Sequence, residues 1–162
     1  MKLILSLFLV FLFSLNVFAT DIDLGLFYED LYGGISFNTE TTHFGVAYYS
    51  YNDSTNIALG KVKEEGWKLH LLFRNKRPEQ LKLNFTGGLA YVCSRVDVTD
   101  RPSYIIDTYA FIMGFETKIG FAEIKFLYYP FKTAVYNYPS PFKSKTATIL
   151  NGEATLLINI PL

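Results

Sequence analysis

The sequence contains few of the side chains on which most catalytic and metal sites depend. Its 162 residues include one cysteine, two histidines and one tryptophan. A single cysteine, Cys93, excludes an internal disulfide, and no group of His, Cys and Asp residues has the spacing of a metal site. We therefore expect no metal ion and no cofactor, and a fold stabilised by packing and backbone hydrogen bonds.

Long apolar runs are absent except at the start of the sequence. The first 19 residues carry Lys2, an almost unbroken apolar run from Leu3 to Phe13, and a small residue, Ala19, at their end. That run is too short to span a bilayer as a helix, and the ending suits signal peptidase. We predict a signal peptide over residues 1–19, with an uncleaved anchor as the alternative, and one exported domain over residues 20–162.

An excess of either charge is also absent. Because Lys2 is the only charged residue among the first 19, the remaining chain carries 14 basic and 15 acidic side chains, and we expect no binding to nucleic acid. Aromatic residues make up 17% and apolar residues 50% of the sequence, which is high for a soluble domain. Since no run of helix length follows the leader, a membrane contact has to be made by strands.

Apolar residues alternate with polar or small ones through almost all of the exported part, with no 3.6-residue stripe, and this predicts an all-β fold. In one segment Trp67, Leu69, Leu71 and Phe73 lie on one face, and Lys68, His70, Leu72 and Arg74 lie on the other. The same period of two occurs in residues 22–28, 35–37, 44–49, 57–60, 81–92, 108–116, 122–129 and 155–162.

The breaks between these segments predict eight strands in an antiparallel up-and-down barrel. The apolar positions change parity across residues 30–34, which indicates either a β-bulge in one long strand or a break between two short ones. The bulge gives eight strands. A weak alternation over residues 133–138 offers an extra hairpin, and ten strands are the alternative.

An even strand number returns both termini to one side of a membrane, as in bacterial barrels. The first, third, fifth and seventh connections then face outward. We expect the long connections, 96–103 and 130–151, on the extracellular side, together with the turn 38–42 beside His43.

The size of the side chains indicates which face points outward. One face is rich in small residues, which suit a lumen just wide enough for side chains. The other is bulky and nearly uncharged, and we predict that it faces lipid. The small residues are Gly25, Gly45, Ala47, Ala58, Gly60, Gly88, Ala90, Ala110 and Gly114. The predicted aromatic girdle consists of Trp67, Phe73, Tyr91, Tyr109 and Tyr128.

The leader, strand number and alternation together resemble the small eight-stranded outer-membrane proteins of Gram-negative bacteria. The stretch GGISFNTETTHFGVAYYSYNDSTNIALGKV, from Gly33 to Val62, is also similar to the YfaZ-type family of predicted outer-membrane proteins. That resemblance implies a membrane barrel and no established activity. The ending Ile-Pro-Leu departs from the terminal aromatic residue that the outer-membrane assembly machinery recognises in many such barrels.

Charged side chains on the small-residue face are predicted to form a structural, salt-bridged network inside the barrel, because buried charges have to be paired. A polar conduit or a binding site is the alternative for these residues. The predicted network consists of Lys68, His70, Arg74, Lys82, Glu116, Glu123 and Lys125.

These observations predict a monomeric, porin-like outer-membrane barrel without catalytic activity, with a role in envelope integrity, adhesion or passage of small apolar solutes. Its expected partners are membrane lipid, lipopolysaccharide and the assembly machinery, the loop 136–145 offering Lys143 and Lys145 to phosphates. One alternative is a soluble periplasmic, lipocalin-like barrel that binds a hydrophobic ligand. The other is a lipid A- or phospholipid-modifying hydrolase, for which His43, near Ser36 and Glu40, is the residue to test.

Overall fold

A computed structural model describes residues 22–53, 61–75, 83–150 and 152–162. The predicted signal peptide lies outside these residues, as do Ala58, Gly60 and Lys82. Within the described part there is no helix of the length and apolarity needed to cross a membrane.

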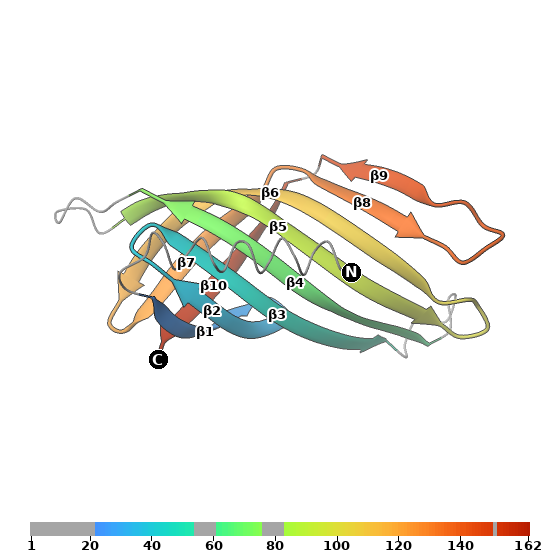
Figure 1. Cartoon of the computed structure of the whole chain (residues 1–162), viewed down its shortest axis with the longest axis horizontal. Helices are drawn as coiled ribbons and strands as arrows, with labels where there is room; N and C mark the ends of the chain where they lie inside the picture. Colours follow the sequence, from blue (N-terminus) through green and yellow to red (C-terminus); the bar gives the residue numbers. More distant parts are fainter. Residues whose placement is uncertain (1–21, 54–60, 76–82, 151) are drawn as a thin grey trace.

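The described residues form ten β-strands, and every hydrogen-bonded pair of strands is antiparallel (Figure 1). β-branched and aromatic side chains are frequent in them, as the pleated backbone favours. The strands are β1 (Asp23–Glu29), β2 (Tyr32–Asn38), β3 (Thr42–Asp53), β4 (Val62–Arg74), β5 (Leu83–Val98), β6 (Tyr104–Ile119), β7 (Ala122–Tyr129), β8 (Lys132–Asn137), β9 (Lys145–Ile149) and β10 (Glu153–Pro161).

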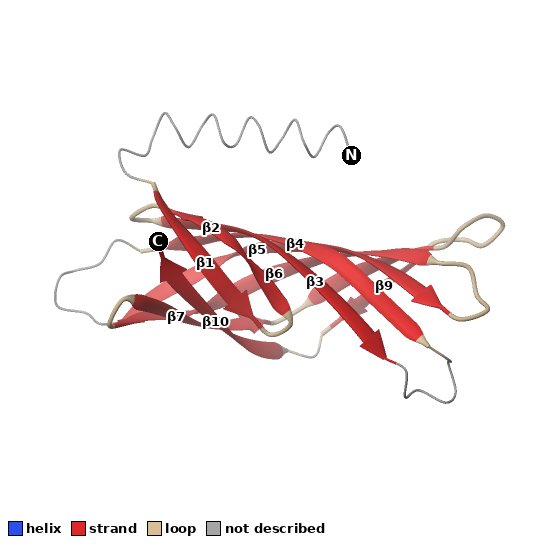
Figure 2. Cartoon of the chain, turned by 90° about the horizontal axis from the view of Figure 1, so that it is seen from below, coloured by secondary structure: helices blue, strands red, loops and turns tan. Residues whose placement is uncertain are grey.

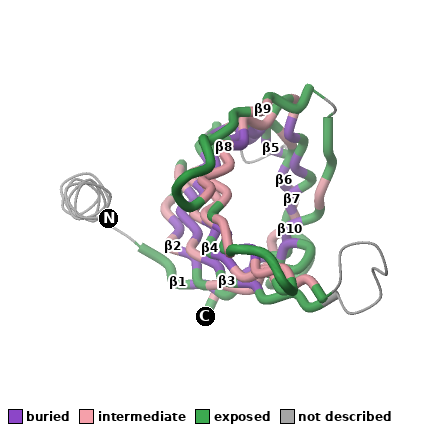
Figure 3. The backbone as a smooth tube through the Cα atoms, turned by 90° about the vertical axis from the view of Figure 1, so that its right-hand side faces the viewer, coloured by how far each residue is buried: buried purple, intermediate pink, exposed green. Residues whose placement is uncertain are grey.

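Eight of these strands close into a barrel, as the sequence predicted. The order runs β5-β4-β3-β2-β1-β10-β7-β6, and the pairing of β5 with β6 completes the ring. Figure 3 shows the ring end-on, with buried and exposed residues alternating along the strands. The hairpin β8–β9 lies outside the ring and accounts for the alternative count of ten.

The N-terminal parity change is a tight turn and not a β-bulge. β1 and β2 pair over their full lengths and are joined at Asp30, whose φ of 50° lies in the left-handed region. Aspartate tolerates this conformation better than most residues. The predicted break at residues 63–66 is also wrong, because β4 runs through it. The predicted strand around Ile57 lies outside the described residues. The barrel has eight strands as predicted, but its first two, β1 and β2, were predicted as one.

The antiparallel order divides the connections between two ends of the barrel (Figure 2). The terminal end carries the chain's C-terminus and the turns 39–41 and 120–121. The opposite end, here called the loop end, carries the connections 99–103 and 130–152, in agreement with their predicted common side. The turn beside His43 therefore belongs to the terminal end, and its predicted position on the same side as the long connections was wrong, because β1 and β2 are separate strands.

One half of the barrel wall is much taller than the other. β3, β4, β5 and β6 have 12 to 16 residues, whereas β1, β2, β7 and β10 have 7 to 9. β6 pairs with β7 over residues 113–119 and with β8 over residues 105–110. Beyond the short strands, the long ones and the β8–β9 hairpin therefore continue as an open sheet at the loop end (Figure 1).

Adjacent glycines in β5 face opposite sides of this wall. A Cβ added to Gly88, on the lumen side, would lie 1.9 Å from the carbonyl oxygen of Leu71, whereas one added to Gly87 would meet nothing closer than 3.5 Å. The strands β4 and β5 can approach only because Gly88 has no side chain.

We predict that Gly88→Ala lowers the free energy of unfolding by about 2 kcal/mol, because β5 has to shift away from β4. Gly87→Ala, the matched control, is expected to change it by less than about 1 kcal/mol. Denaturant titration followed by far-UV circular dichroism measures both values. Equal effects of the two substitutions would contradict this account of the lumen face.

Candidate functional site

The lumen near the terminal end holds an ionic cluster, here called the basal cluster, of Arg74, Glu116, Glu123 and Lys125. The Lys125 ammonium donates to Glu116 at 2.5 Å and to Glu123 at 3.1 Å. The Arg74 guanidinium donates to the same two carboxylates at 2.7 Å and 3.2 Å. Lys125 is 0% and Glu116 1% exposed. Each charge of the cluster thus lies against an opposite charge.

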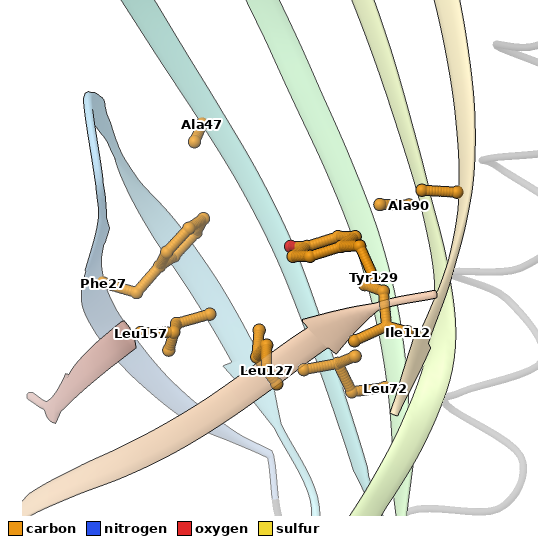
Figure 4. Close-up of a cluster of buried hydrophobic side chains, with 9 residues drawn as sticks. Phe27, Ala47, Leu72, Ala90, Ile112, Leu127, Tyr129 and Leu157 are labelled. Carbon is orange, nitrogen blue, oxygen red and sulfur yellow. The ribbon is translucent and has the colours of Figure 1, made fainter. Parts of the chain in front are cut away.

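Apolar side chains fill the middle of the lumen. Figure 4 shows them reaching toward one another from strands on opposite sides of the ring. They belong to the same buried cluster, as expected for an eight-stranded lumen that is only wide enough for side chains. Its large members are Phe27, Leu72, Ile112, Leu127 and Leu157.

A second set of polar side chains, here called the upper cluster, lies on the loop-end side of the apolar layer and consists of Glu29, Lys68 and Tyr129. Lys68 Nζ lies 2.7 Å from Glu29 and 2.9 Å from the Tyr129 hydroxyl, which itself donates to Glu29. The ammonium also lies 4.9 Å from the ring centre of Tyr32, within cation–π range. The buried lysine is thus held by a carboxylate and two aromatic rings.

The two histidines lie beside the apolar layer and connect to the basal cluster. Their rings are stacked, and their Nε2 atoms are 2.8 Å apart. His43 Nδ1 donates to the Asn38 side-chain oxygen at 2.5 Å, so a neutral His43 accepts from His70 at Nε2. From Asn38 the bonds continue through Ser36 and Asn159, with Asn159 donating to Glu123 at 3.3 Å.

The charged lumen side chains balance. Among the described residues, three cations and three anions are buried or nearly so, and their charges cancel when both histidines are neutral. Pairing of this kind offsets the large cost of taking charges out of water. The cations are Lys68, Arg74 and Lys125, and the anions are Glu29, Glu116 and Glu123.

The structure brings most of the predicted lumen residues together, in two groups. Arg74, Glu116, Glu123 and Lys125 meet in the basal cluster, and Lys68 with His70 lies nearer the loop end. Lys82 lies outside the described residues. The sequence reasoning missed Glu29, Asn38, Asn159 and Tyr129, although each occupies a small-face position of its strand.

A small cavity lies between the upper cluster and the loop end. It has a volume of about 90 Å³ and is lined by Lys68, Tyr129 and Asp30, among others. Burial and the negative charge of the neighbouring Glu29 raise the pKa of Asp30. The space is sufficient for roughly three water molecules and not for a lipophilic ligand of ordinary size.

His43, the residue named for a hydrolase centre, is buried. Its side chain is 1% exposed, and its Nδ1 binds the Asn38 side chain. Ser36 donates its hydroxyl proton to Asn159. Among the described residues, no group of three or more His, Cys, Asp or Glu side chains could hold a metal ion.

The outer face of the barrel carries a belt of exposed apolar side chains. Trp67, Phe73, Tyr109 and Tyr128 of the predicted girdle are between 43% and 57% exposed, and Tyr91 is half-buried against Tyr109. Each barrel strand contributes to the belt. Members from the other strands include Leu26, Ile35, Tyr48 and Ile158, which are all exposed.

The aromatic residues of the belt are sorted between its two ends. In β1, β3, β4, β5, β6 and β7, a tyrosine or tryptophan lies where the apolar stretch stops toward the loop end, and the phenylalanines of the belt lie farther toward the terminal end. In β4, for example, Trp67 is followed in the loop direction by Glu65 and Lys63, and Phe73 lies at the other end. The polar-tipped set is Tyr28, Tyr48, Trp67, Tyr91, Tyr109 and Tyr128.

Comparison of the chain with protein-family models, with curated proteins and with solved structures found no match. The resemblance to the YfaZ-type family therefore stays a prediction.

We predict that Glu116→Gln lowers the free energy of unfolding by about 3 kcal/mol, because Arg74 and Lys125 then share only Glu123. Adding Lys125→Met to this variant is expected to restore part of the loss. Glu65→Gln removes an exposed partner of Lys63 and serves as the control, with an expected effect below about 1 kcal/mol. Denaturant titrations that give equal losses for Glu116→Gln and Glu65→Gln would refute a structural role of the basal cluster.

Proposed function

We propose that the protein is an outer-membrane β-barrel whose eight barrel strands cross the bilayer, with the loop end at the cell surface and the terminal end in the periplasm. The observation that carries the proposal is the distribution of side chains across the wall. Bulky apolar residues face outward on every barrel strand, while six paired ions lie inside. A continuous exposed apolar surface of this extent is typical of proteins that contact lipid.

The filled lumen supports this proposal over a soluble ligand-binding barrel. A lipocalin-like protein places its apolar face inside, around a cavity for its ligand. Here the lumen contains ions and a packed apolar layer, and the cavity above them measures about 90 Å³. Larger apolar hollows lie on the outer face, where they are lined by residues such as Leu89 and Phe126, and at the loop end beyond the ring, where Tyr104 and Phe142 line one of about 430 Å³.

We further propose a role in envelope integrity or adhesion and not in catalysis or solute passage. The apolar layer blocks passage through the ring, whereas the open sheet at the loop end presents a surface beyond the belt. Its tip carries Phe142, which is 62% exposed, next to Lys143. Aromatic and basic side chains of this kind suit contact with lipopolysaccharide phosphates or another surface partner.

The single tryptophan provides a direct test. In phospholipid vesicles, Trp67 is expected to show blue-shifted emission that lipids brominated near the top of their acyl chains quench most strongly. In a Trp67→Phe background, Phe126→Trp places the reporter in mid-belt, where bromines deep in the chain should quench most. The lipocalin-like alternative predicts no quenching for either protein.

Recovery in the periplasmic supernatant, without a compact form resistant to sodium dodecyl sulfate, would also overturn the membrane assignment.

The filled lumen predicts that the protein conducts no ions. In planar bilayers containing the purified protein we expect no stepwise current under conditions in which a porin control conducts, because the apolar layer around Leu127 closes the ring. Reproducible current steps that scale with the amount of protein would reject the closed lumen while leaving the membrane assignment intact.

A further inference from the structure

A pocket of about 430 Å³, here called the tip pocket, lies at the loop end, between the tips of β4, β5 and β6 and the loop that joins β8 to β9 (Figure 1). Among the residues that line it, Arg101 alone is charged. The aromatic and aliphatic side chains that line it belong to Val62, Val98, Tyr104, Tyr138 and Phe142.

The tip pocket lies beyond the apolar belt, on the concave side of the open sheet. Val98 lies on the same face of β5 as the lumen residue Ala90, because an even number of residues separates them. The belt stops on β5 at Tyr91, and from there to Val98 the strand continues for roughly 23 Å. A ligand therefore enters this pocket from water and not from the apolar core of a bilayer.

The charge of Arg101 is available to such a ligand. Within the described part of the chain its guanidinium has no ion-pair partner, whereas that of Arg95, on the outer face of β5, lies 3.1 Å from Asp97. Burial raises the pKa of the Tyr104 hydroxyl, and the positive charge of Arg101 opposes that rise, so the guanidinium acts within the pocket. The backbone amide of Arg101 donates to Val98 at 3.1 Å, which holds the turn independently of the side chain.

The acidic residues nearest to the pocket do not line it. Asp100 precedes Arg101 in the turn, and Glu64, on the concave face of β4, accepts a hydrogen bond from the Tyr49 hydroxyl. The charge that the pocket presents to a ligand is therefore positive, and it favours an anionic group.

The aromatic wall is in place before a ligand arrives. The rings of Tyr104 and Tyr138 are 5.2 Å apart and inclined by 37°, and Phe142 is 62% exposed beside them. The backbone amide of Phe142 donates to Pro139 at 3.1 Å. At the base of the loop Asn137 donates to Asp107 at 2.8 Å, which ties β8 to β6. Because these bonds already order the loop, binding requires little further ordering.

A sugar that carries a negative charge matches this set of groups. One face of a pyranose ring consists of C–H groups, which pack on aromatic rings, and its edge carries hydroxyls, which can bond the tyrosine hydroxyls. The guanidinium of Arg101 can bind a carboxylate or a phosphate through two parallel N–H groups. A hydrocarbon chain would leave the tyrosine hydroxyls and the guanidinium without partners. The volume is that of an ordinary small-molecule site.

We infer that the tip pocket binds an acidic sugar, a pyranose that carries a carboxylate or a phosphate. This inference deepens the proposed role in envelope integrity or adhesion. It rests on that role, because the proposed orientation is what places the pocket among the sugars of the cell surface.

The experiment compares three soluble sugars. Glucuronate, glucose 6-phosphate and glucose are each titrated into the purified full-length protein in detergent, and binding is followed by ligand-detected NMR. We expect at least one of the two anionic sugars to bind about tenfold more tightly than glucose. Salt should weaken the binding of that sugar alone. The difference between the two anionic sugars identifies the anion that the pocket accepts.

Two substitutions with matched controls locate the binding. Arg101→Gln is expected to reduce the affinity for the anionic sugar about tenfold, to that for glucose, whereas Arg95→Gln, which removes a paired guanidinium from the outer face, should leave it unchanged. Phe142→Ala should weaken all binding about threefold. Phe121→Ala, which removes a similarly exposed ring at the terminal end, should have no effect.

Equal affinities for the anionic sugars and glucose, or equal losses from Arg101→Gln and Arg95→Gln, would overturn the site. Inorganic phosphate that binds as tightly as glucose 6-phosphate would overturn the assignment to a sugar. Failure of the membrane proposal is distinguishable from these results, because it is measured separately, by the escape of Trp67 from quenching in vesicles, whereas the sugar titrations need no bilayer.

Discussion

The ion pair between Lys125 and Glu116 is the contact on which the interior of this barrel depends. A closed ring of eight strands satisfies its own backbone and leaves a lumen only wide enough for side chains. Any ion placed there has to be paired within the ring. The two carboxylates of the basal cluster come from β6 and β7 and both accept from Arg74 on β4. The cluster thus connects strands that are not neighbours in the sheet.

The hydrogen-bonded side chains that run from this cluster through Asn159 and Ser36 require a glycine in β1. Ser36 and Asn159 lie on either side of β1 and meet across it through a hydrogen bond of 2.6 Å. A Cβ on Gly25 would lie 2.7 Å from both side-chain oxygens. A glycine in β1 is therefore what allows β2 and β10 to bond over the intervening strand. The buried polar network therefore depends on a small residue of the inner face, because a side chain at Gly25 would fill the space that this hydrogen bond occupies.

Alternation in the sequence predicted the β class, the number of strands in the ring, and the lumen side for Lys68, Arg74, Glu116, Glu123 and Lys125, although two of the strands were counted differently. It could not distinguish a turn at Asp30 from a bulge, because both change parity. It also failed at Lys63 to Gly66, where β4 extends beyond the belt and polar residues occupy both faces. The sequence could not predict which lumen residues contact each other, for a different reason. Glu29 and Tyr129 are 100 residues apart, and they meet only because the ring closes between β1 and β10.

The sorting of aromatic residues gives the belt a direction. Tyrosine and tryptophan rings combine an apolar body with a polar tip, and they are most stable where lipid meets water. They lie at the loop end, where Tyr48 packs on Trp67 with ring centres 5.0 Å apart. At the terminal end the belt includes residues such as Phe73 and Phe85, which have no polar group. In the proposed orientation the loop-end boundary therefore fixes the depth of the barrel, and the apolar terminal end can follow the local thickness of the bilayer. The tall sheet of β3 to β6 begins at that fixed boundary, so its height above the lipid is set by the same residues.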